Sequence, residues 1–242
     1  MRGDVPPTTM YQPPLATDRV MHFARVPRHI GIIPDGNRRW AEARGLDRAE
    51  GYGWGIDPGF RLLDVARKLG VEEVSVYGFT KENVRRAPTQ VAAFCAACTE
   101  VARRLVAEGA AVLAVGDADS AVFPDALRPL ARQRSPGDIR INLLVNYGWK
   151  WDLFGSARRR PRGAGASARS AEGSASRLGS SHVSRIDLVI RWGGRRRLSG
   201  FLPVQCAYAD IYVIDTLWPD MHVDEFLDAL RWYQEQDVTI GG

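Results

Sequence analysis

The chain of 242 residues is long enough for one sizeable α/β domain with a packed core, and its net charge is +5. It has no run of 18 uncharged apolar residues, and Met1 to Ala16 lacks the apolar core of a signal peptide. Its three cysteines give no disulfide framework, and Cys95 and Cys98 lack the further ligands of a zinc site. We therefore expect a cytoplasmic protein without a transmembrane helix.

The positive charge is concentrated in one segment. Between Gly155 and Ile186, seven arginines stand against the single carboxylate of Glu172. Because this stretch otherwise consists largely of Ser, Ala and Gly, it lacks the apolar residues needed for a core, and a solvated segment explains it better than a nucleic-acid surface. We predict no nucleic-acid partner.

The chain is expected to form a disordered tail over residues 1–26 and a single domain over 27–242, with a low-complexity Arg/Ser/Gly/Ala segment at about 156–184. Strand-like runs recur at Ile30–Ile33, Val74–Tyr77, Ala111–Val115, Ile139–Val145, Leu188–Ile190 and Ile211–Val213. Between them, Phe60–Leu69 and Val91–Val106 space their apolar residues as helices do. This alternation predicts an α/β fold with a mostly parallel sheet covered on both faces, in which ligands bind beyond the carboxyl ends of the strands.

Three loops after predicted strands contain the same few functional groups. The first is Asp35–Arg39, at a strand-to-helix switch, followed by Arg48; the second is Gly78–Arg86; the third is Arg191–Phe201. Glycines and helix starts offer N–H groups to anions, arginines bind phosphate bidentately, and carboxylates hold magnesium. Any single arginine here could be a solvated loop charge, but the three loops together predict a site for two phosphorylated ligands.

The chain resembles the cis-prenyltransferases, the undecaprenyl diphosphate synthase family, from about residue 28 to the C-terminus. The matching segments, in the family's order, are His29–Trp40, Tyr77–Arg86, Asn142–Asp152, Asp187–Tyr212 and Thr216–Asp220. The patterns Asp-Gly-Asn-x-Arg-Trp and Arg-x-Gly…Arg-x-Ser are specific to the family. The resemblance implies a homodimer with a six-stranded, mostly parallel sheet flanked by helices and a hydrophobic tunnel for the prenyl chain.

The resemblance also implies a reaction. A prenyltransferase of this family condenses isopentenyl diphosphate with an allylic prenyl diphosphate, depends on Mg²⁺, releases pyrophosphate and forms a Z double bond. Positioning and electrostatic stabilisation of the departing pyrophosphate would supply most of the rate. Contact with a membrane is expected only at its periphery, through the lipid product.

Roles for individual residues follow from the resemblance. Asp35 would bind Mg²⁺ and act in catalysis, Asn83 would remove a proton or align a substrate, and Asp210 would be a second metal ligand. The implied substrate-binding residues are Gly36, Asn37, Arg39, Trp40, Arg48, Tyr52, Thr80, Arg86, Arg191, Arg197 and Ser199. Among these, Arg191, Arg197 and Ser199 would bind isopentenyl diphosphate.

The chain departs from the family pattern at several positions. Tyr52 stands in place of a histidine, Val84 in place of an aromatic residue, and Asp210 in place of a glutamate. Arg195 stands where the family has a glutamate, which reverses the charge. Gly78 stands where a bulky residue favours short products, so we expect an open tunnel there.

Two alternatives to a regular synthase remain. The chain could couple allylic diphosphates irregularly or cyclise them, using the same phosphate site. It could instead be a non-catalytic partner subunit that stabilises an active synthase. The retained Asp35 argues against a partner subunit, because an inactive scaffold has no need of a metal-binding carboxylate.

Overall fold

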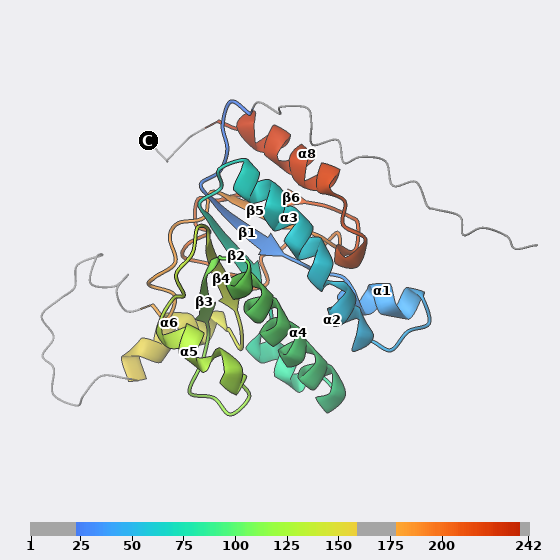
Figure 1. Ribbon diagram of the computed structural model, residues 1–242, viewed down its shortest axis with the longest axis vertical. Helices are drawn as coiled ribbons and strands as arrows, with labels where there is room; N and C mark the ends of the chain where they lie inside the picture. The colour runs from blue at the N-terminus through green and yellow to red at the C-terminus, as the bar shows by residue number, and fades with distance from the viewer. Residues whose placement is uncertain (1–22, 159–177, 238–242) are drawn as a thin grey trace, which may run out of the picture.

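The computed structural model describes residues 23–158 and 178–237 (Figure 1). Most of the predicted tail and of the low-complexity segment lies outside these ranges, so their boundaries stay predictions. Inside the described part, Phe23 and Val26 already pack against the core, and Ser180 and Val183 are buried. The packed structure therefore includes the last residues of both predicted segments.

One sheet of six parallel strands forms the centre of the described structure (Figure 1). The strands are β1 (His29–Ile33), β2 (Glu73–Tyr77), β3 (Ala111–Val115), β4 (Arg140–Leu144), β5 (Leu188–Arg191) and β6 (Asp210–Val213), in the spatial order β3-β4-β2-β1-β5-β6. Every pair of neighbours is parallel. All six predicted strands are confirmed, and so is the parallel sheet.

The register brings the carboxyl ends of the central strands to one edge. Ile33 of β1 lies opposite Arg191 of β5, and Tyr77 of β2 lies opposite Leu144 of β4. All residues of β1, β3 and β5 are buried, as expected for a parallel sheet that is covered on both faces. The loops after β1, β2 and β5 therefore lie close together.

Helices connect the strands and cover the sheet. They are α1 (Asn37–Ala43), α2 (Glu50–Trp54), α3 (Ile56–Lys68), α4 (Pro88–Ala107), α5 (Arg128–Arg132), α6 (Trp149–Arg158) and α8 (Val223–Gln234), with the 3₁₀ turns η2 (Lys81–Arg85), η3 (Asp125–Leu127) and η4 (Trp218–Asp220). The helices predicted at 60–69 and 91–106 correspond to α3 and α4. No helix in the described ranges is long and apolar enough to cross a membrane.

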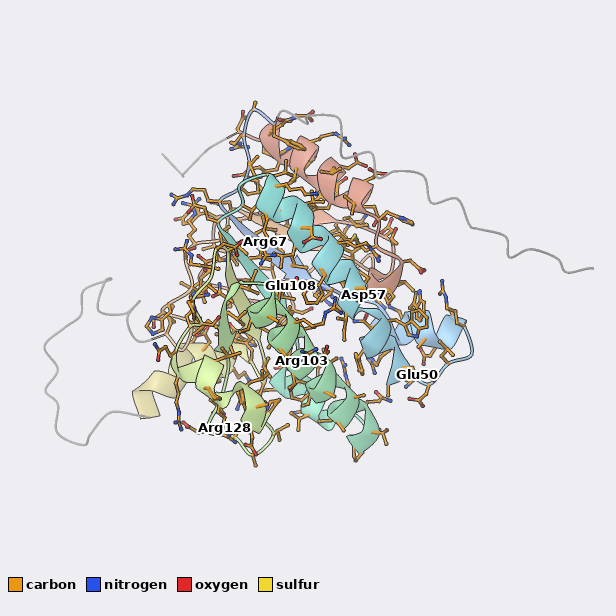
Figure 2. The ribbon with its side chains drawn as sticks, in the orientation of Figure 1. Glu50, Asp57, Arg67, Arg103, Glu108 and Arg128 are labelled. Atoms are coloured by element: carbon orange, nitrogen blue, oxygen red, sulfur yellow. The ribbon has the colours of Figure 1, made fainter. Side chains whose placement is uncertain are left out.

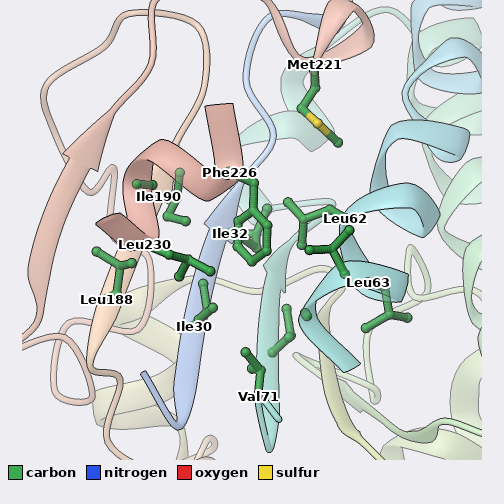
Figure 3. Packing of buried hydrophobic residues seen from close by; sticks show 14 of the residues in the cluster. Ile30, Ile32, Leu62, Leu63, Val71, Leu188, Ile190, Met221, Phe226 and Leu230 are labelled. Atoms are coloured by element: carbon green, nitrogen blue, oxygen red, sulfur yellow. The ribbon is translucent and has the colours of Figure 1, made fainter. Parts of the chain in front are cut away.

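The main core lies between the sheet and the helices α3 and α8. Figure 3 shows Leu62 and Leu63 of α3 and Phe226 of α8 gathered over Ile30 and Ile32 of β1. The outer sides of α3 and of its neighbour α4 carry charges: Asp57 on α3, Arg103 on α4 and Glu108 just after α4, all labelled in Figure 2, are exposed. Helices with one apolar and one charged face are what a sheet of this kind requires.

A buried polar network occupies the amino end of the sheet. The Glu73 carboxylate accepts hydrogen bonds from Asn142 Nδ2 over 2.6 Å and from Ser184 Oγ over 2.9 Å. The His29 ring contacts Ser75 Oγ at 2.8 Å and Ser184 Oγ at 2.9 Å. His29 and Glu73 are both 2% exposed, and each finds several partners. This network has the features of a structural element rather than of a binding site.

Candidate active site

Asp35 follows β1 directly, where the chain turns into α1. Gly36 precedes the helix with φ +117, and a Cβ there would lie 2.9 Å from Leu217 Cδ2, so glycine is required. The Trp218 N–H donates to the Asp35 carbonyl over 3.0 Å and fixes the loop. The Asp35 side chain is thereby held in place while about a third of it stays exposed.

Two guanidinium groups hold the Asp35 carboxylate. Its Oδ2 lies 2.7 Å from Arg191 Nη2, and its Oδ1 lies 3.5 Å from Arg39 Nη2. Arg191 ends β5, the neighbour of β1, and is 4% exposed. Because a buried guanidinium needs a counter-charge, Asp35 and Arg191 stabilise each other.

The third loop wraps around Arg191. Arg191 Nη1 donates to Ser199 Oγ over 2.9 Å and to the carbonyl of Arg197. Arg39 Nη2 donates to the Gly193 carbonyl over 2.8 Å. The first and third loops are therefore joined into one unit by two arginines and a carboxylate.

The second loop holds Thr80 and Asn83 in a reciprocal cap at the start of η2. Asn83 Oδ1 accepts from the Thr80 N–H over 3.0 Å, and the Thr80 hydroxyl accepts from the Asn83 N–H. Lys81 Nζ pairs with Asp117 at 2.6 Å and secures the loop. Asn83 Nδ2, by contrast, forms no hydrogen bond with a described residue, so its protons remain available to a ligand.

Tyr52, Arg86 and Phe94 meet on the opposite wall. Arg86 Nη1 donates to Tyr52 Oη over 2.7 Å, and the Tyr52 ring stacks on Phe94 with centroids 4.4 Å apart. Burial lowers the pKa of Arg86, and the nearby Tyr52 hydroxyl opposes that shift. Since Tyr52 accepts from Arg86, its own hydroxyl proton is free to be donated.

These loops enclose a polar pocket of about 580 Å³. Twelve of the predicted site residues line it: Asp35, Gly36, Asn37, Arg39, Arg48, Tyr52, Thr80, Asn83, Arg86, Arg191, Arg197 and Ser199. Seven arginines face three carboxylates there, namely Arg38, Arg39, Arg48, Arg86, Arg191, Arg195 and Arg197 against Asp35, Glu42 and Glu82. The excess of cations suits a ligand with several negative charges.

Two predicted site residues lie elsewhere. Trp40 is buried, does not line the pocket, and donates from Nε1 to Asp220 Oδ1 over 2.7 Å. Asp210 begins β6 and pairs with Leu188, three residues before Arg191. At about 3.3 Å per residue, Asp210 lies roughly 10 Å along the sheet from the pocket edge within one chain. The structure therefore brings Asp35 and Asp210 to different ends of the strands.

An apolar cavity of about 110 Å³ adjoins the polar pocket. The two share a ring of lining residues: Pro34, Asn37, Tyr52, Tyr77, Gly78 and Phe94. A Cβ at Gly78 would lie 2.6 Å from the Leu144 carbonyl oxygen. A side chain at this position would therefore clash with β4, and the open tunnel expected at Gly78, which lines both cavities, stays a prediction.

Sequence reasoning gave no role to Tyr77, Phe94, Arg38 or Arg195, yet all four line the polar pocket. Tyr77 Oη donates to the Ser199 carbonyl over 2.8 Å, and burial raises the pKa of its hydroxyl. Tyr77, at the end of a predicted strand, could have been found from its position. Phe94 gives no such signal, because one aromatic residue on an amphipathic helix is indistinguishable from core.

The described residues contain no group of three His, Cys, Asp or Glu side chains that could hold a metal by themselves. Mg²⁺, however, is usually bound by one or two carboxylates together with phosphate oxygens and water. Asp35, which is partly exposed in a pocket of phosphate-binding character, fits that mode of binding.

Comparison with known proteins identifies the family. Residues 33–241 match the family described as "Putative undecaprenyl diphosphate synthase". The chain is 31% identical over 232 residues to an isoprenyl transferase of Leptospira interrogans, covering 90% of this chain and 96% of the other. It is 34% identical over 230 residues to a trans,polycis-polyprenyl diphosphate synthase of Thermobifida fusca, described as (2Z,6E)-farnesyl diphosphate specific, covering 90% and 81%.

A solved structure shares the fold. It is lavandulyl diphosphate synthase from Lavandula x intermedia in complex with dimethylallyl diphosphate, with a TM-score of 0.78 and 25% identity, covering 89% of this chain and 98% of that one. Together with the parallel sheet and its arginine-lined pocket, these similarities show that the chain belongs to the undecaprenyl diphosphate synthase family of cis-prenyltransferases and is an isoprenyl transferase enzyme.

Proposed function

We propose that the protein condenses isopentenyl diphosphate with an allylic prenyl diphosphate in a Mg²⁺-dependent reaction that forms a Z-prenyl diphosphate. The observation that carries this proposal is the position of Asp35. It lies among arginines at the carboxyl edge of the sheet, in a polar pocket that opens onto an apolar cavity. A diphosphate head and a prenyl tail need these two environments side by side.

The cations support two diphosphates rather than one. Asp35 engages Arg191 and Arg39, and Glu42 pairs with Arg48. Arg38, Arg86, Arg195 and Arg197 form no ion pair with a described carboxylate. Guanidinium groups left without counter-charge in a concave site attract phosphates strongly, and bidentate contacts fix their orientation.

The two halves of the pocket suggest where each substrate binds. The allylic diphosphate would lie by Asp35, Gly36, Asn37, Arg39 and Arg48, with its chain entering the apolar cavity. Isopentenyl diphosphate would lie by Arg191, Arg197 and Ser199, the residues already joined by hydrogen bonds in the third loop.

In the reaction, the allylic C1–O bond breaks and pyrophosphate leaves with the electron pair. The isopentenyl double bond attacks C1, a C–C bond forms, and a proton passes from the isopentenyl carbon to the released pyrophosphate, which restores a double bond. Asp35 would hold the Mg²⁺ ion, which would supply positive charge next to the leaving group. Arginines, and the Tyr52 hydroxyl proton, would bind the departing pyrophosphate as its charge develops.

Asn83 is better suited to alignment than to proton removal. Its Oδ1 accepts from the Thr80 backbone, so only its Nδ2 donors remain to contact a substrate. A side-chain amide is also a very weak base, whereas a donor beside the reacting carbons can orient a diphosphate oxygen.

A homodimer is proposed on the basis of the free sheet edge. β6 is an edge strand, and Val204, Tyr208 and Ile211 in and before it are exposed apolar residues. Exposed apolar side chains along a sheet edge are typical of an association surface. Light scattering of the purified protein would give the oligomeric state.

Irregular coupling is a second candidate, because the structural neighbour at 25% identity is a lavandulyl diphosphate synthase in complex with dimethylallyl diphosphate. Both reactions would use the same pocket and begin with the same bond cleavage. They differ in the nucleophile, which would be a second allylic diphosphate instead of isopentenyl diphosphate.

The test is incubation with Mg²⁺, radiolabelled isopentenyl diphosphate and dimethylallyl, geranyl or farnesyl diphosphate in turn, followed by chain-length analysis. Incorporation that is lost with EDTA and in Asp35→Ala is expected. Product from dimethylallyl diphosphate alone would select irregular coupling. No product from a folded protein with any primer would contradict both and leave the partner-subunit role.

A further inference from the structure

Three consecutive arginines in the third loop lie in two different places. Arg195 lines the polar pocket, whereas Arg196 lines a separate cavity beside β6, with Ile211, Val213 and Trp232. Arg197 lines both cavities. The loop therefore separates neighbouring guanidinium groups, and only some of them face the substrate pocket.

The backbone that carries Arg195 is firmly anchored. Gly193 and Gly194 both have positive φ, and their N–H groups donate to the carbonyls of Thr216 over 2.8 Å and Ile214 over 2.9 Å. The Gly193 carbonyl accepts from Arg39, which also contacts Asp35. The backbone just before Arg195 is thereby tied to the loop that carries Asp35 and to the segment after β6.

The Arg195 guanidinium has no partner within the described chain. It forms no hydrogen bond or ion pair with any residue that the structure describes, and the Asp35 carboxylate in the same pocket is already engaged by Arg191 and Arg39. Additional positive charge beside other cations is unfavourable unless an anion is bound there. A negatively charged ligand removes that repulsion and supplies the missing partner.

Resting on the proposed function, we infer that Arg195 is a diphosphate-binding residue on the Arg191–Ser199 side of the pocket, where it raises the affinity for isopentenyl diphosphate. It stands on the loop that presents Arg197 and Ser199, so a diphosphate bound there lies within the field of a third guanidinium. The glutamate expected at this position from the family pattern would repel the same ligand. The charge reversal at 195 is thus a gain of phosphate affinity.

The experiment measures binding of isopentenyl diphosphate, and separately of inorganic pyrophosphate, to the full chain by calorimetry in metal-free buffer. The variants are Arg195→Glu, Arg195→Gln and the matched control Arg196→Glu. Each is checked by circular dichroism and thermal melting. Because both arginines are exposed, the three variants should fold as the parent does.

The affinity for isopentenyl diphosphate should fall about 30-fold in Arg195→Glu and about 5-fold in Arg195→Gln, and change less than 2-fold in Arg196→Glu. The salt dependence of binding should become shallower in both Arg195 variants, which a purely structural role would not cause. In turnover, the KM for isopentenyl diphosphate should rise while kcat changes little.

Equal losses in Arg195→Glu and Arg196→Glu would overturn the inference, because they would show a general effect of surface charge. Unchanged affinity in Arg195→Glu would overturn it as well. Either result can occur in a protein that incorporates isopentenyl diphosphate normally, so it would leave the proposed function intact. Absence of turnover in the unmodified protein would instead count against the proposed function.

Discussion

Charged side chains cluster at both ends of the sheet, but they are buried and paired at one end and exposed and largely unpaired with described carboxylates at the other. At the amino end, Glu73 is 2% exposed and receives hydrogen bonds from Asn142 and Ser184 and an ion pair from Arg140 at 3.1 Å. At the carboxyl end, Asp35 is partly exposed among seven arginines, four of which pair with no carboxylate that the structure describes.

The difference separates the end of the sheet that contributes to stability from the end that serves function. A buried charge with every partner in place costs little to keep and much to disturb, and it offers nothing to a ligand. Cations held together around an open pocket are unfavourable until a polyanion arrives. The amino end should therefore govern folding and the carboxyl end catalysis, and mutations at the two ends should separate these properties.

The largest effect is expected for Asp35→Asn. The amide cannot hold Mg²⁺ as a carboxylate does, although its oxygen can still accept from Arg191. Activity should fall about 1000-fold, while the free energy of unfolding falls by only about 1 kcal/mol. Radiolabel incorporation and urea denaturation measure the two quantities. Asp57→Asn, an exposed aspartate that pairs with Arg104 on α4, serves as the control and should keep full activity. A loss of stability in proportion to the loss of activity would contradict the claim that the carboxyl end governs catalysis and not folding.

Glu73→Ala should have the reverse profile. Removing this carboxylate deprives Asn142 and Ser184 of their charged acceptor, so that Asn142 Nδ2 keeps only Ser75 Oγ, and it leaves Arg140 without its buried partner. We expect the free energy of unfolding to fall by about 3 kcal/mol, as judged by urea denaturation. Glu72→Ala, at the neighbouring position, removes an exposed ion pair with Arg28 and should cost less than about 1 kcal/mol. If Glu73→Ala lowered kcat in protein shown to be folded, the amino end would have a catalytic role after all.

The sheet could be predicted because each strand is a short apolar run between turn signals, and such runs have few other structures open to them. Most of the pocket could be predicted because functional groups follow strands whose carboxyl ends must meet at one edge of a parallel sheet. The individual side-chain pairs within the pocket could not be predicted. Asp35 meets Arg191 because β1 and β5 are neighbours, and that neighbour relation spans more than 150 residues of chain.

The exceptions have physical reasons as well. Trp40 belongs to the same motif as Asp35, but the helical turn of α1 directs it to Asp220 on η4 and away from the pocket. Asp210 begins its strand, whereas Asp35 follows β1 and Arg191 ends β5. A motif alone does not reveal in which direction a side chain points from a helix, nor at which end of a strand a residue lies.

A smaller effect, on selectivity, is expected within the carboxyl end. Phe94 stacks on Tyr52 at the junction of the polar pocket and the apolar cavity. Phe94→Ala should widen this mouth and improve kcat/KM for farnesyl relative to dimethylallyl diphosphate by about 10-fold, or about 1.4 kcal/mol. Val91→Ala removes apolar volume from the same helix but lines neither cavity. If both variants had the same primer preference as the parent, the mouth would not select the primer.

The smallest effect concerns the pH dependence of stability at the amino end. Burial lowers the pKa of His29 below its ordinary 6.5, although Glu73 opposes the shift. The unfolded chain therefore binds a proton as pH falls through 6.5, while folded His29 resists it, so stability is retained above this pH and declines below it. Burial raises the pKa of Glu73, but the His29 charge and hydrogen bonds from Asn142 and Ser184 outweigh it and keep that pKa below 4.5. Protonation of Glu73 therefore destabilises the fold only at more acidic pH.

Between pH 7.5 and 5.5 the melting temperature should fall. His29→Gln should flatten this decline, whereas His182→Gln, at an exposed histidine, should leave it unchanged. A decline that is equally steep in His29→Gln would mean that the buried network does not sense protons, and the amino end would then be inert in titration as well as in catalysis.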